Sequence, residues 1–444
     1  MREPKYKRVV DAFAARIRDG GWPAGTRLPT HRRLAADEGI AVVTASRVYA
    51  ELEAMGLVSC EQGRGTFVRD LAAPGEGADE RSVAADAVDL SFNSPSIPGQ
   101  AGLLRQALRD LATAGDLDAL LRYQPHRGRA GDRAAVARHL RRRGLETGRE
   151  RVLIVDGAQH GLAVTAMALL RAGDVVAVDA LTYPGFRVLA RTLGLDLAPL
   201  PVTADGPDLD AFDRLCRRRR VRAMYAMPTL HNPLGWVLSA ERRARLVEIA
   251  RRHGVTIIED ASYAYLAEDA PPPLAMLAPE ATVYVSGLSK SVATGLRFGF
   301  AVAPAELVPA LESAIRSTTW NTPALTAAIA RRWLDDGTVA RLEVRKREDA
   351  RQRQALASEV LAGLPWTGHP SSYFRWLPLA RDSRPDRIVA ALARRRVAVA
   401  TAEPFATTPA VPQALRLALG SVGLTELRSA LEAVREEAEG DVHR

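Results

Sequence analysis

Residues 285–299 read VSGLSKSVATGLRFG and contain Lys290, one of only four lysines among the 61 lysines and arginines of the chain. The chain uses arginine as its basic residue almost everywhere else. Arginine can replace lysine as a surface cation, but its guanidinium stays protonated and cannot form a Schiff base. A partly buried lysine can lose its proton and attack an aldehyde. Taken alone, the observation fits either a nucleophilic lysine or an ordinary surface lysine.

The composition indicates a soluble protein of several domains. A length of 444 residues suits two or three domains at about 100–200 residues each. The two cysteines, Cys60 and Cys216, give no disulfide framework and favour a reducing compartment. The start of the chain lacks the apolar core of a signal peptide, and no apolar run approaches the ~18–20 residues that a membrane span needs. We therefore expect a cytoplasmic protein with no membrane partner and no metal site.

The positive charge is concentrated near the start of the chain. The net charge is +9, and residues 1–70 contain twelve basic and nine acidic residues. Basic residues are therefore in excess by three in this short segment, which favours a polyanionic partner for it. The run of four arginines at 217–220 is more simply explained as the solvated end of a helix.

The composition also divides the chain. Residues Asp70–Asp86 are rich in Ala, Gly, Pro and acids, which predicts a flexible linker. After this segment, strand-like runs alternate with amphipathic helices such as Gly161–Arg171 and Glu241–Arg252. The predicted strands are Val152–Val155, Val175–Val178, Ala223–Met227, Thr256–Glu259, Val283–Val285 and Phe298–Val302. This alternation predicts an α/β fold with a mostly parallel sheet.

The first 70 residues predict three helices and a hairpin. Apolar residues recur at helical spacing in Tyr6–Asp19 and Val42–Met55. Thr30 can cap a helix between them, and Gly39-Ile40 can make the tight turn that follows. Two helices joined by a short turn that contains glycine form a helix-turn-helix. Leu57–Val68 then reads as a β-hairpin, or wing.

This segment resembles the GntR-type winged helix-turn-helix, through Leu28–Ala35 (LPTHRRLA), Gly56-Leu57-Val58 and Gly63–Val68 (GRGTFV). The resemblance implies that the third helix enters the major groove of an operator in double-stranded DNA. The expected DNA contacts are Arg32, Thr44, Arg47 and Arg64. One departure is Ala41-Val42, where the family usually has Ser-Arg. The alternative is a small helical domain that binds protein.

Four motifs after residue 89 each follow a predicted strand. Asp156–Gln159 (DGAQ) lies between a strand and a helix, and backbone N–H groups at the start of a helix bind phosphate. Thr182–Phe186 (TYPGF) is an aromatic Pro-Gly turn. His231–Gly235 (HNPLG) is an Asn-Pro-x-Gly turn, and Ile257–Tyr263 (IIEDASY) ends a strand with acids. Each motif alone also has a structural explanation as a turn or a helix cap.

In this order, and with Gly295–Gly299 (GLRFG) after Lys290, the motifs resemble the fold-type I pyridoxal 5′-phosphate (PLP) enzymes of the aspartate aminotransferase class. The resemblance extends from about Asp89 to the C-terminal region. It implies that Lys290 forms the Schiff base with PLP. The implied cofactor contacts are Gly157, Ala158, Gln159, Tyr183, Asn232, Asp260, Tyr263, Ser289, Lys290 and Arg297.

The resemblance also gives these residues distinct roles. Asp260 would keep the pyridine nitrogen protonated, which makes the ring an electron sink. Asn232 and Tyr263 would contact the 3′ oxygen, and Tyr183 would stack on the pyridine. Arg297 would hold the phosphate through two parallel hydrogen bonds.

Two further matches concern an effector and a second subunit. Arg416, in Leu415-Arg416-Leu417, matches the arginine that binds the carboxylate of an amino acid. Tyr123, in Tyr123-Gln124-Pro125, matches a tyrosine that reaches the phosphate of the partner subunit, which implies a homodimer.

Two departures concern the phosphate site. Gly287 stands where Ser or Thr is common, so that one phosphate ligand is either missing or moved to Ser286 or Ser289. Thr294 replaces a frequent proline.

The order of the two resemblances is that of the MocR/GabR regulators. We expect a DNA-binding domain over 1–70, a linker over 71–88 and an aminotransferase-like domain over 89–444, with a small C-terminal α/β subdomain from about residue 315. The implied function is a PLP-dependent transcription regulator that senses an amino compound, or PLP itself, through an internal aldimine on Lys290. The alternatives are an active aminotransferase with a DNA-binding domain, and a DNA-binding protein that uses the second fold only to dimerise.

Overall fold

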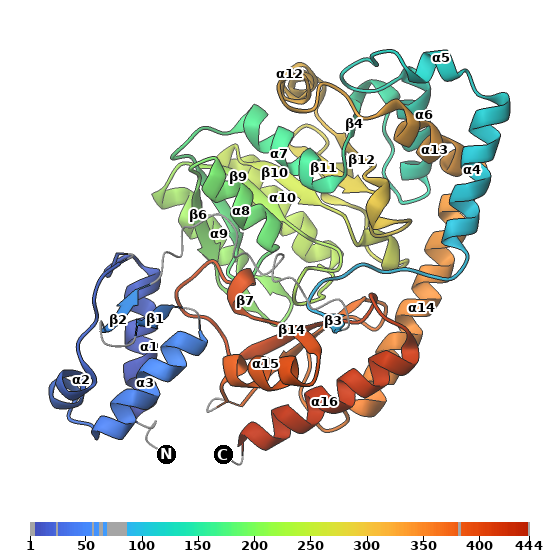
Figure 1. Ribbon diagram of the computed structural model, residues 1–444. Coiled ribbons are helices and arrows are strands. Elements are labelled where there is room, and N and C mark those ends of the chain that lie inside the picture. Colours follow the sequence, from blue (N-terminus) through green and yellow to red (C-terminus); the bar gives the residue numbers. More distant parts are fainter. Residues whose placement is uncertain are drawn as a thin grey trace.

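The computed structural model describes residues 5–23, 25–55, 57–61, 65–68, 87–380 and 383–442 (Figure 1). The predicted linker Asp70–Asp86 and the predicted DNA contact Arg64 lie outside these residues.

The N-terminal domain has the predicted helix-turn-helix and wing. Its elements are α1 (Lys5–Arg18), α2 (His31–Glu38), α3 (Val42–Ala54), β1 (Val58–Glu61) and β2 (Gly65–Val68). Thr30 caps α2 as predicted, since its side chain accepts a hydrogen bond of 3.3 Å from the backbone N–H of Arg33. Gly39 ends α2 at φ 58°, a left-handed conformation that favours glycine. Val10, Val48 and other buried residues of the three helices form one apolar core.

The second domain is built on a seven-stranded sheet in the order β4-β12-β11-β10-β9-β5-β6. Its strands are β4 (Val152–Val155), β5 (Val175–Asp179), β6 (Asp196–Leu200), β9 (Val221–Ala226), β10 (Thr256–Asp260), β11 (Thr282–Gly287) and β12 (Gly299–Val302). β12 is antiparallel to β4 and β11, and the other neighbouring pairs are parallel. The prediction of a mostly parallel sheet is confirmed.

Helices cover both faces of this sheet (Figure 1). Ile257 and Ile258 are neighbours in β10 and both are fully buried, but they belong to different apolar clusters. Successive side chains of a strand point to opposite faces, so the sheet has a core on each side. The helices are α4 (Gln100–Ala114), α5 (Leu117–Leu120), α6 (Ala130–Arg141), α7 (Ala158–Leu169), α8 (Pro184–Thr192), α9 (Leu209–Arg218), α10 (Ala240–His253), α11 (Leu274–Leu277), α12 (Val308–Thr318) and α13 (Ala324–Asp335).

Short elements complete this domain. The two-stranded ribbon is β7 (Val202–Thr203) with β8 (Gly206–Pro207). The 3-10 helices of the chain are Arg149–Arg151, Ala264–Leu266, Thr294–Leu296, Ala305–Leu307 and Glu403–Phe405.

The small subdomain has a four-stranded sheet in the order β13-β15-β14-β3. Its strands are β3 (Val88–Leu90), β13 (Phe374–Pro378), β14 (Val397–Thr401) and β15 (Ala414–Ala418), and its helices are α14 (Thr338–Val360), α15 (Pro385–Arg394) and α16 (Leu424–Val442). β3 pairs in parallel with β14.

Two predicted boundaries need correction. The linker prediction over 71–88 included Val88, but β3 begins at this residue because Val88 pairs with Val397 of β14. The subdomain was predicted to begin near residue 315. Helix α13 lies after that point, yet it packs on α6 and α4 of the large sheet, with the buried Trp333 in the same apolar cluster as Val136. The long helix α14 then leads into the small subdomain.

The N-terminal domain contacts the small subdomain through a buried ion pair. Glu51 of α3 lies with Oε2 3.0 Å from Nε of Arg384, and both side chains are almost fully buried. Arg387 of α15 donates a hydrogen bond to the other oxygen of Glu51. Helix α3 therefore lies directly against α15 (Figure 1).

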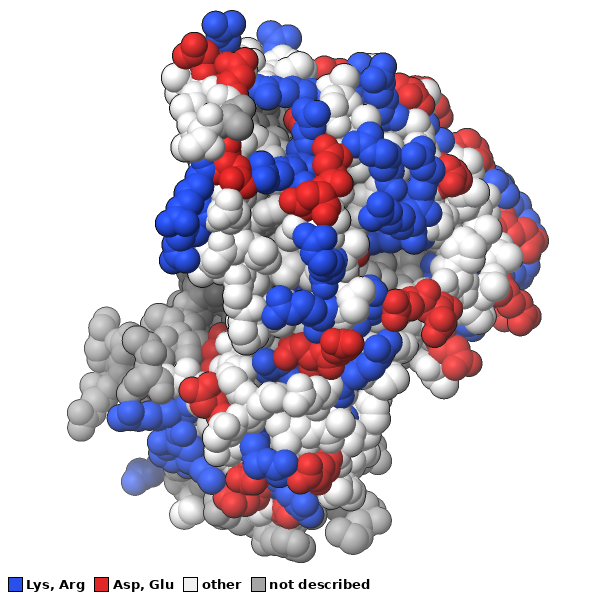
Figure 2. Space-filling view, turned by 90° about the vertical axis from the view of Figure 1, so that its right-hand side faces the viewer, with Lys and Arg blue, Asp and Glu red and all other residues white. Residues whose placement is uncertain are grey.

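The face that carries α4, α14 and α16 mixes both signs of charge (Figure 2). Its exposed pairs include Arg428 with Glu359 and Arg435 with Glu439. Among the residues that the structure describes, no helix has the length and apolar character needed to cross a bilayer.

Candidate functional site

The predicted cofactor residues converge at one edge of the large sheet. β4, β5, β9, β10 and β11 all end at this edge, and β12 begins there. Ligands of α/β proteins bind at the carboxyl ends of the parallel strands. The segments after these strands contain Gly157, Tyr183, Asn232, Asp260 and Lys290, so motifs that are far apart in sequence meet at this edge.

Asp260 ends β10 and is only 2% exposed. Its Oδ1 accepts hydrogen bonds from the backbone N–H and hydroxyl of Ser262, at 3.0 and 2.6 Å, and its Oδ2 accepts one of 2.8 Å from Tyr225. Burial raises the pKa of the Asp260 carboxyl, while the bonds from Ser262 and Tyr225 and the positive charge of Lys290 oppose the rise. A cation in front of this carboxyl would favour its ionised form further.

Lys290 lies between two aromatic rings and a backbone carbonyl. Its Nζ donates a hydrogen bond to the backbone oxygen of Asn93 and lies 4.8 Å from the ring centre of Phe92. The ring centre of Tyr263 is 6.0 Å away. The side chain of Asn93 donates a bond of 3.2 Å to the hydroxyl of Tyr263. Asn93 thus contacts both a predicted Schiff-base residue and a predicted cofactor contact.

Glycines let three backbone segments meet beside the start of α7. A Cβ on Gly157 would lie 2.9 Å from Nη2 of Arg297, and a Cβ on Gly299 would lie 2.6 Å from the carbonyl carbon of Gly157. Gly157 has φ 85°, and α7 begins at the next residue, Ala158. Arg297 donates a bond of 3.1 Å to the backbone oxygen of Asp156. The guanidinium is therefore held beside the free N–H groups of a helix start, a combination that suits a phosphate.

Gly287 departs from the resemblance for a steric reason. A Cβ at this position would lie 2.9 Å from the backbone oxygen of Phe298 and 3.1 Å from Cα of Gly299, so a serine would not fit without a backbone shift. Of the two substitutes, Ser286 donates to the backbone oxygen of Ala261 at 3.1 Å and is fully buried. The hydroxyl of Ser289 is buried and makes no hydrogen bond among the described residues. Ser289 is therefore the hydroxyl that is available to a ligand.

Ser289 is one of several buried oxygens here without a hydrogen-bond partner in the described part of the chain. The others at this edge are Oδ1 of Asn93, Asp156 and Asn232, and Oε1 of Gln159. More than nine in ten buried polar groups in proteins are paired, so such a group of unpaired atoms fits a polar ligand. These atoms belong to residues that the sequence assigned to PLP or to their direct neighbours. The residues present therefore fit PLP.

Tyr183 and Asn232 follow β5 and β9. Tyr183 is half-buried and precedes α8, and a Cβ on Gly185 would lie 2.5 Å from its hydroxyl oxygen. Asn232 is 3% exposed. The preceding His231 is fully buried, with Nε2 3.3 Å from Oδ2 of Asp179, and it stacks on Trp236 with ring centres 4.0 Å apart. This packing fixes the turn that presents Asn232.

Arg416 lies in the middle of β15 and is 4% exposed. It donates a bond of 2.8 Å to the backbone oxygen of Ser91. Its guanidinium lies 5.6 Å from the ring centres of both Phe374 and Phe405. Aromatic faces and a planar fork of donors suit recognition of a carboxylate on an apolar amino compound.

Tyr123 does not join this site within one chain. Its side chain is 85% exposed, and its ring contacts Trp320 with ring centres 5.9 Å apart. Leu121, two residues earlier, is 86% exposed. Exposed apolar groups of this kind are typical of a protein interface.

The predicted DNA contacts lie on α2 and α3. Arg32 is exposed, and Thr44 is half-buried. The guanidinium of Arg47 lies 4.4 Å from the ring centre of Tyr6 and pairs with Glu51 at 3.5 Å. The Arg47 side chain is still 45% exposed.

The Ala41-Val42 departure leaves the start of α3 with no side-chain cap. The first turn of this helix is apolar at the surface, because Val43 is 81% exposed.

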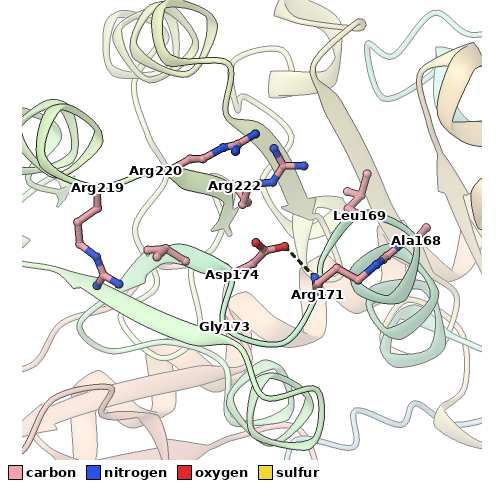
Figure 3. Close-up of a pocket in the computed structure, with 9 residues that line it drawn as sticks. Ala168, Leu169, Arg171, Gly173, Asp174, Arg219, Arg220 and Arg222 are labelled. Atoms are coloured by element: carbon pink, nitrogen blue, oxygen red, sulfur yellow. Dashed lines mark hydrogen bonds between the residues drawn. The ribbon is translucent and has the colours of Figure 1, made fainter.

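A hollow of about 730 Å³ lies at the opposite edge of the sheet, where β5 and β9 begin (Figure 3). Arg219, Arg220 and Arg222 line it together with Asp174, which accepts a bond from the backbone N–H of Arg171. Arg219 pairs with Asp196 at 2.6 Å, on the surface. The hollow is open and far from the strand ends that carry the cofactor residues, in keeping with a solvated helix end.

Three residues of the site were missed by the sequence analysis. Asn93 and Tyr225 contact the site through tertiary packing, and no local motif marks them. Lys346 is fully buried and donates to the backbone oxygen of Lys290 at 3.0 Å. The scarcity of lysine was a signal that could have found Lys346.

Comparison with known proteins matches both parts of the chain. The family described as aminotransferase class I and II matches residues 85–434, and that described as bacterial regulatory proteins, gntR family, matches residues 5–68. The uncharacterized HTH-type transcriptional regulator YdeF of Bacillus subtilis is 28% identical over 415 residues, which cover 93% of this chain and 89% of that protein.

Two similar proteins from Thermus thermophilus are aminotransferases by name. The 2-aminoadipate transaminase is 31% identical over 326 residues, or 71% of this chain and 80% of that protein. The crystal structure of LysN, an α-aminoadipate aminotransferase complexed with N-(5′-phosphopyridoxyl)-L-leucine, has a TM-score of 0.74 at 26% identity. The match covers 82% of this chain and 95% of that one.

Proposed function

Since this chain belongs to the aminotransferase class I and II family and carries an N-terminal domain of the gntR family of bacterial regulatory proteins, we propose that it is a PLP-dependent transcription regulator. In this proposal the N-terminal domain binds operator DNA, and the second domain senses an amino compound, or PLP itself, at Lys290. The domain order is that of the MocR/GabR-type regulators. The main support is the group of buried oxygens without partners around Lys290.

The residues of the site each have a task in this proposal. PLP supplies an aldehyde and an electron-withdrawing ring. The amine of Lys290 attacks that aldehyde, and the carboxyl of Asp260 holds a proton on the ring nitrogen. Arg297, Ser289 and the N–H groups at the start of α7 bind the phosphate. Asn232 and Tyr263 orient the ring through its 3′ oxygen.

The effector and the recognition helix contact the same small subdomain. Arg416 in β15 would bind the carboxylate of an amino compound. β15 pairs with β14, and α15 packs on β14. Arg387 of α15 and the preceding Arg384 hold Glu51 of α3. A ligand that prefers one position of the subdomain would therefore also favour one position of α3, as ligand control of DNA binding requires.

A homodimer forms part of this proposal. Operators with two half-sites are read by dimers with two-fold symmetry. The exposed Tyr123 and Leu121 would be buried against the partner subunit, where Tyr123 would reach the phosphate.

An active aminotransferase is the second candidate, and one observation favours it. The 2-aminoadipate transaminase of Thermus thermophilus is similar over 71% of this chain, and Lys290, Asp260 and Arg416 are all present at the site. Steady transamination of an amino donor and a keto acid at about 1 s⁻¹ or faster would support this candidate. Single turnovers without sustained exchange would support the regulator.

The regulator is tested by measuring DNA affinity under three conditions. Operator fragments are first selected from random DNA with the purified full-length protein. Their affinity is then measured at one fixed salt concentration without PLP, with PLP, and with PLP plus each of a panel of amino acids and amines. We expect PLP or one amino compound to change the affinity at least fivefold. Equal affinity under all conditions would leave the second domain as a dimerisation scaffold and refute the sensor.

A further inference from the structure

Lys346 uses all of its hydrogen-bonding capacity inside the protein. It lies in α14, and its side chain is fully buried. Its Nζ donates to the backbone oxygens of Pro95 at 2.8 Å, Lys290 at 3.0 Å and Val292 at 2.9 Å. A lysine ammonium has three N–H donors, and here each has a carbonyl acceptor.

The geometry explains why this position is lysine in a chain that otherwise uses arginine. Three carbonyls from two separate segments converge on one atom. An ammonium is a compact point donor, whereas a guanidinium is a planar fork that cannot direct three N–H groups to one centre. Two of the four lysines of the chain, Lys290 and Lys346, therefore lie side by side in this buried region.

The two segments that Lys346 joins lie on either side of the Lys290 side chain. One is the backbone of Lys290 itself, whose carbonyl also accepts a bond of 2.8 Å from Tyr265. The other is the segment from Asn93 to Pro95, and the backbone oxygen of Asn93 accepts a hydrogen bond from the Lys290 amine. Lys346 thus fixes both the origin of the Lys290 side chain and the carbonyl that receives its end.

We propose that Lys346 is a positioning residue, which holds Lys290 in the geometry needed for attack on the aldehyde of PLP. This inference rests on the proposed PLP site. Lys346 does not touch the reacting atoms and acts only through the backbone of Lys290 and the Asn93–Pro95 segment. Loss of its three bonds would let the Lys290 loop and this segment separate, and a small misplacement of a reacting group can slow a reaction by a large factor.

Burial supports the same role. It lowers the pKa of Lys346 to about 7, with the charge of Lys290 acting in the same direction and that of Asp349 opposing it. Burying an amine in this way is costly unless its donors are satisfied. The cost is met here by the three carbonyls that the ammonium draws together.

The experiment compares Lys346→Gln and Lys346→Met with Arg345→Met. Glutamine keeps two donors and should preserve the fold if methionine does not. Arg345 is the matched control, because it is exposed on the same helix and donates to the backbone oxygen of Pro98 at 2.9 Å, close to the same segment. Circular dichroism and thermal unfolding of the PLP-free proteins first establish that each variant is folded.

The main readout is the rate at which added PLP becomes attached to Lys290 in a borohydride-stable form. We expect attachment at least tenfold slower in Lys346→Met and at least threefold slower in Lys346→Gln, with Arg345→Met unchanged. Hydrogen exchange in the PLP-free protein should rise in peptides 288–293 and 93–96 of the Lys346 variants alone.

A folded Lys346→Gln protein that attaches PLP within twofold of the wild-type rate would overturn the positioning role. Slowing in Arg345→Met equal to that in Lys346→Gln would also overturn it, since it would show a general effect of loosening α14. Failure of the wild-type protein to attach PLP at Lys290 would instead refute the proposed cofactor site, and this role with it.

Discussion

Glu259→Gln tests how burial controls ionisation beside the site. Glu259 precedes Asp260 in β10, and its side chain is 1% exposed. One carboxylate oxygen accepts from the backbone N–H of Leu274 at 3.0 Å, and the other from that of Ala275 at 2.8 Å. Burial raises the pKa of Glu259 from 4.5 to about 7, although these two bonds and Arg243 oppose the rise.

The sign and size of the effect follow from this pKa. In the folded protein Glu259 keeps its proton up to about pH 7, whereas in the unfolded chain it loses the proton near 4.5. Between these values unfolding releases a proton, so the wild-type free energy of unfolding falls as the pH rises. The pKa difference of about 2.5 corresponds to roughly 3 kcal/mol.

Glutamine is a good mimic of the protonated glutamate, since both have one acceptor oxygen and one donor group. The free energies of unfolding of wild type and Glu259→Gln should therefore be similar near pH 4.5. Above pH 7.5 the variant should gain roughly 3 kcal/mol relative to wild type. Urea unfolding at the two pH values and one protein concentration measures this difference.

Glu280→Gln is the control with the opposite sign. Its hydrogen bond from Arg251, of 2.7 Å, holds the pKa of the exposed Glu280 below its usual value, so this variant should lose stability relative to wild type as the pH rises. The account of Glu259 is refuted if the difference between Glu259→Gln and wild type is independent of pH, or if it shrinks as the pH rises.

Three further changes test the other sites. Glu51→Gln leaves the buried Arg384 and Arg387 without their shared carboxylate and should destabilise the domain contact by roughly 3 kcal/mol; unchanged hydrogen exchange in α3 would contradict this. Arg47→Ala should weaken operator binding at fixed salt and flatten its salt dependence, and equal affinity would exclude it as a contact. Arg416→Ala should weaken binding of amino acids at least tenfold but spare amines without a carboxylate, and an equal loss for both would refute carboxylate recognition.

The sequence predicted the elements of the fold well where their signal is local. The run Val152–Val155 is apolar throughout because the strand is buried on both faces, and its predicted bounds are those of β4. Helix α7 begins at Ala158, three residues before the predicted start. The reason is Gly157, whose left-handed φ of 85° lets the chain turn directly into the helix.

Pairings between distant segments could not be predicted in this way. β3 has only three residues and pairs with β14, which is encoded near the other end of the chain. Nothing in the local pattern of Val88–Leu90 indicates this partner. The same reason explains why Asn93, which follows β3, was not recognised as a neighbour of Lys290.

The candidate site shows the same division. The residues of the local motifs, such as Asp260 and Asn232, come together at one edge of the sheet as adjacent parallel strands require. The steric reason for Gly287 depends on Phe298 and Gly299 in the neighbouring strand segment, and it could not be inferred from the motif alone. The contact of Arg47 with Tyr6 likewise depends on how α1 packs against α3.

The most direct test of the central claim is to identify which lysine binds PLP. The purified protein is mixed with PLP, its absorbance spectrum is recorded, and it is reduced with borohydride and digested for peptide mapping. With only four lysines in the chain, the attachment site can be assigned without ambiguity. We predict a visible absorbance band and a reduced PLP adduct on Lys290. No band, or an adduct confined to Lys5 and Lys7, would contradict the proposed cofactor site.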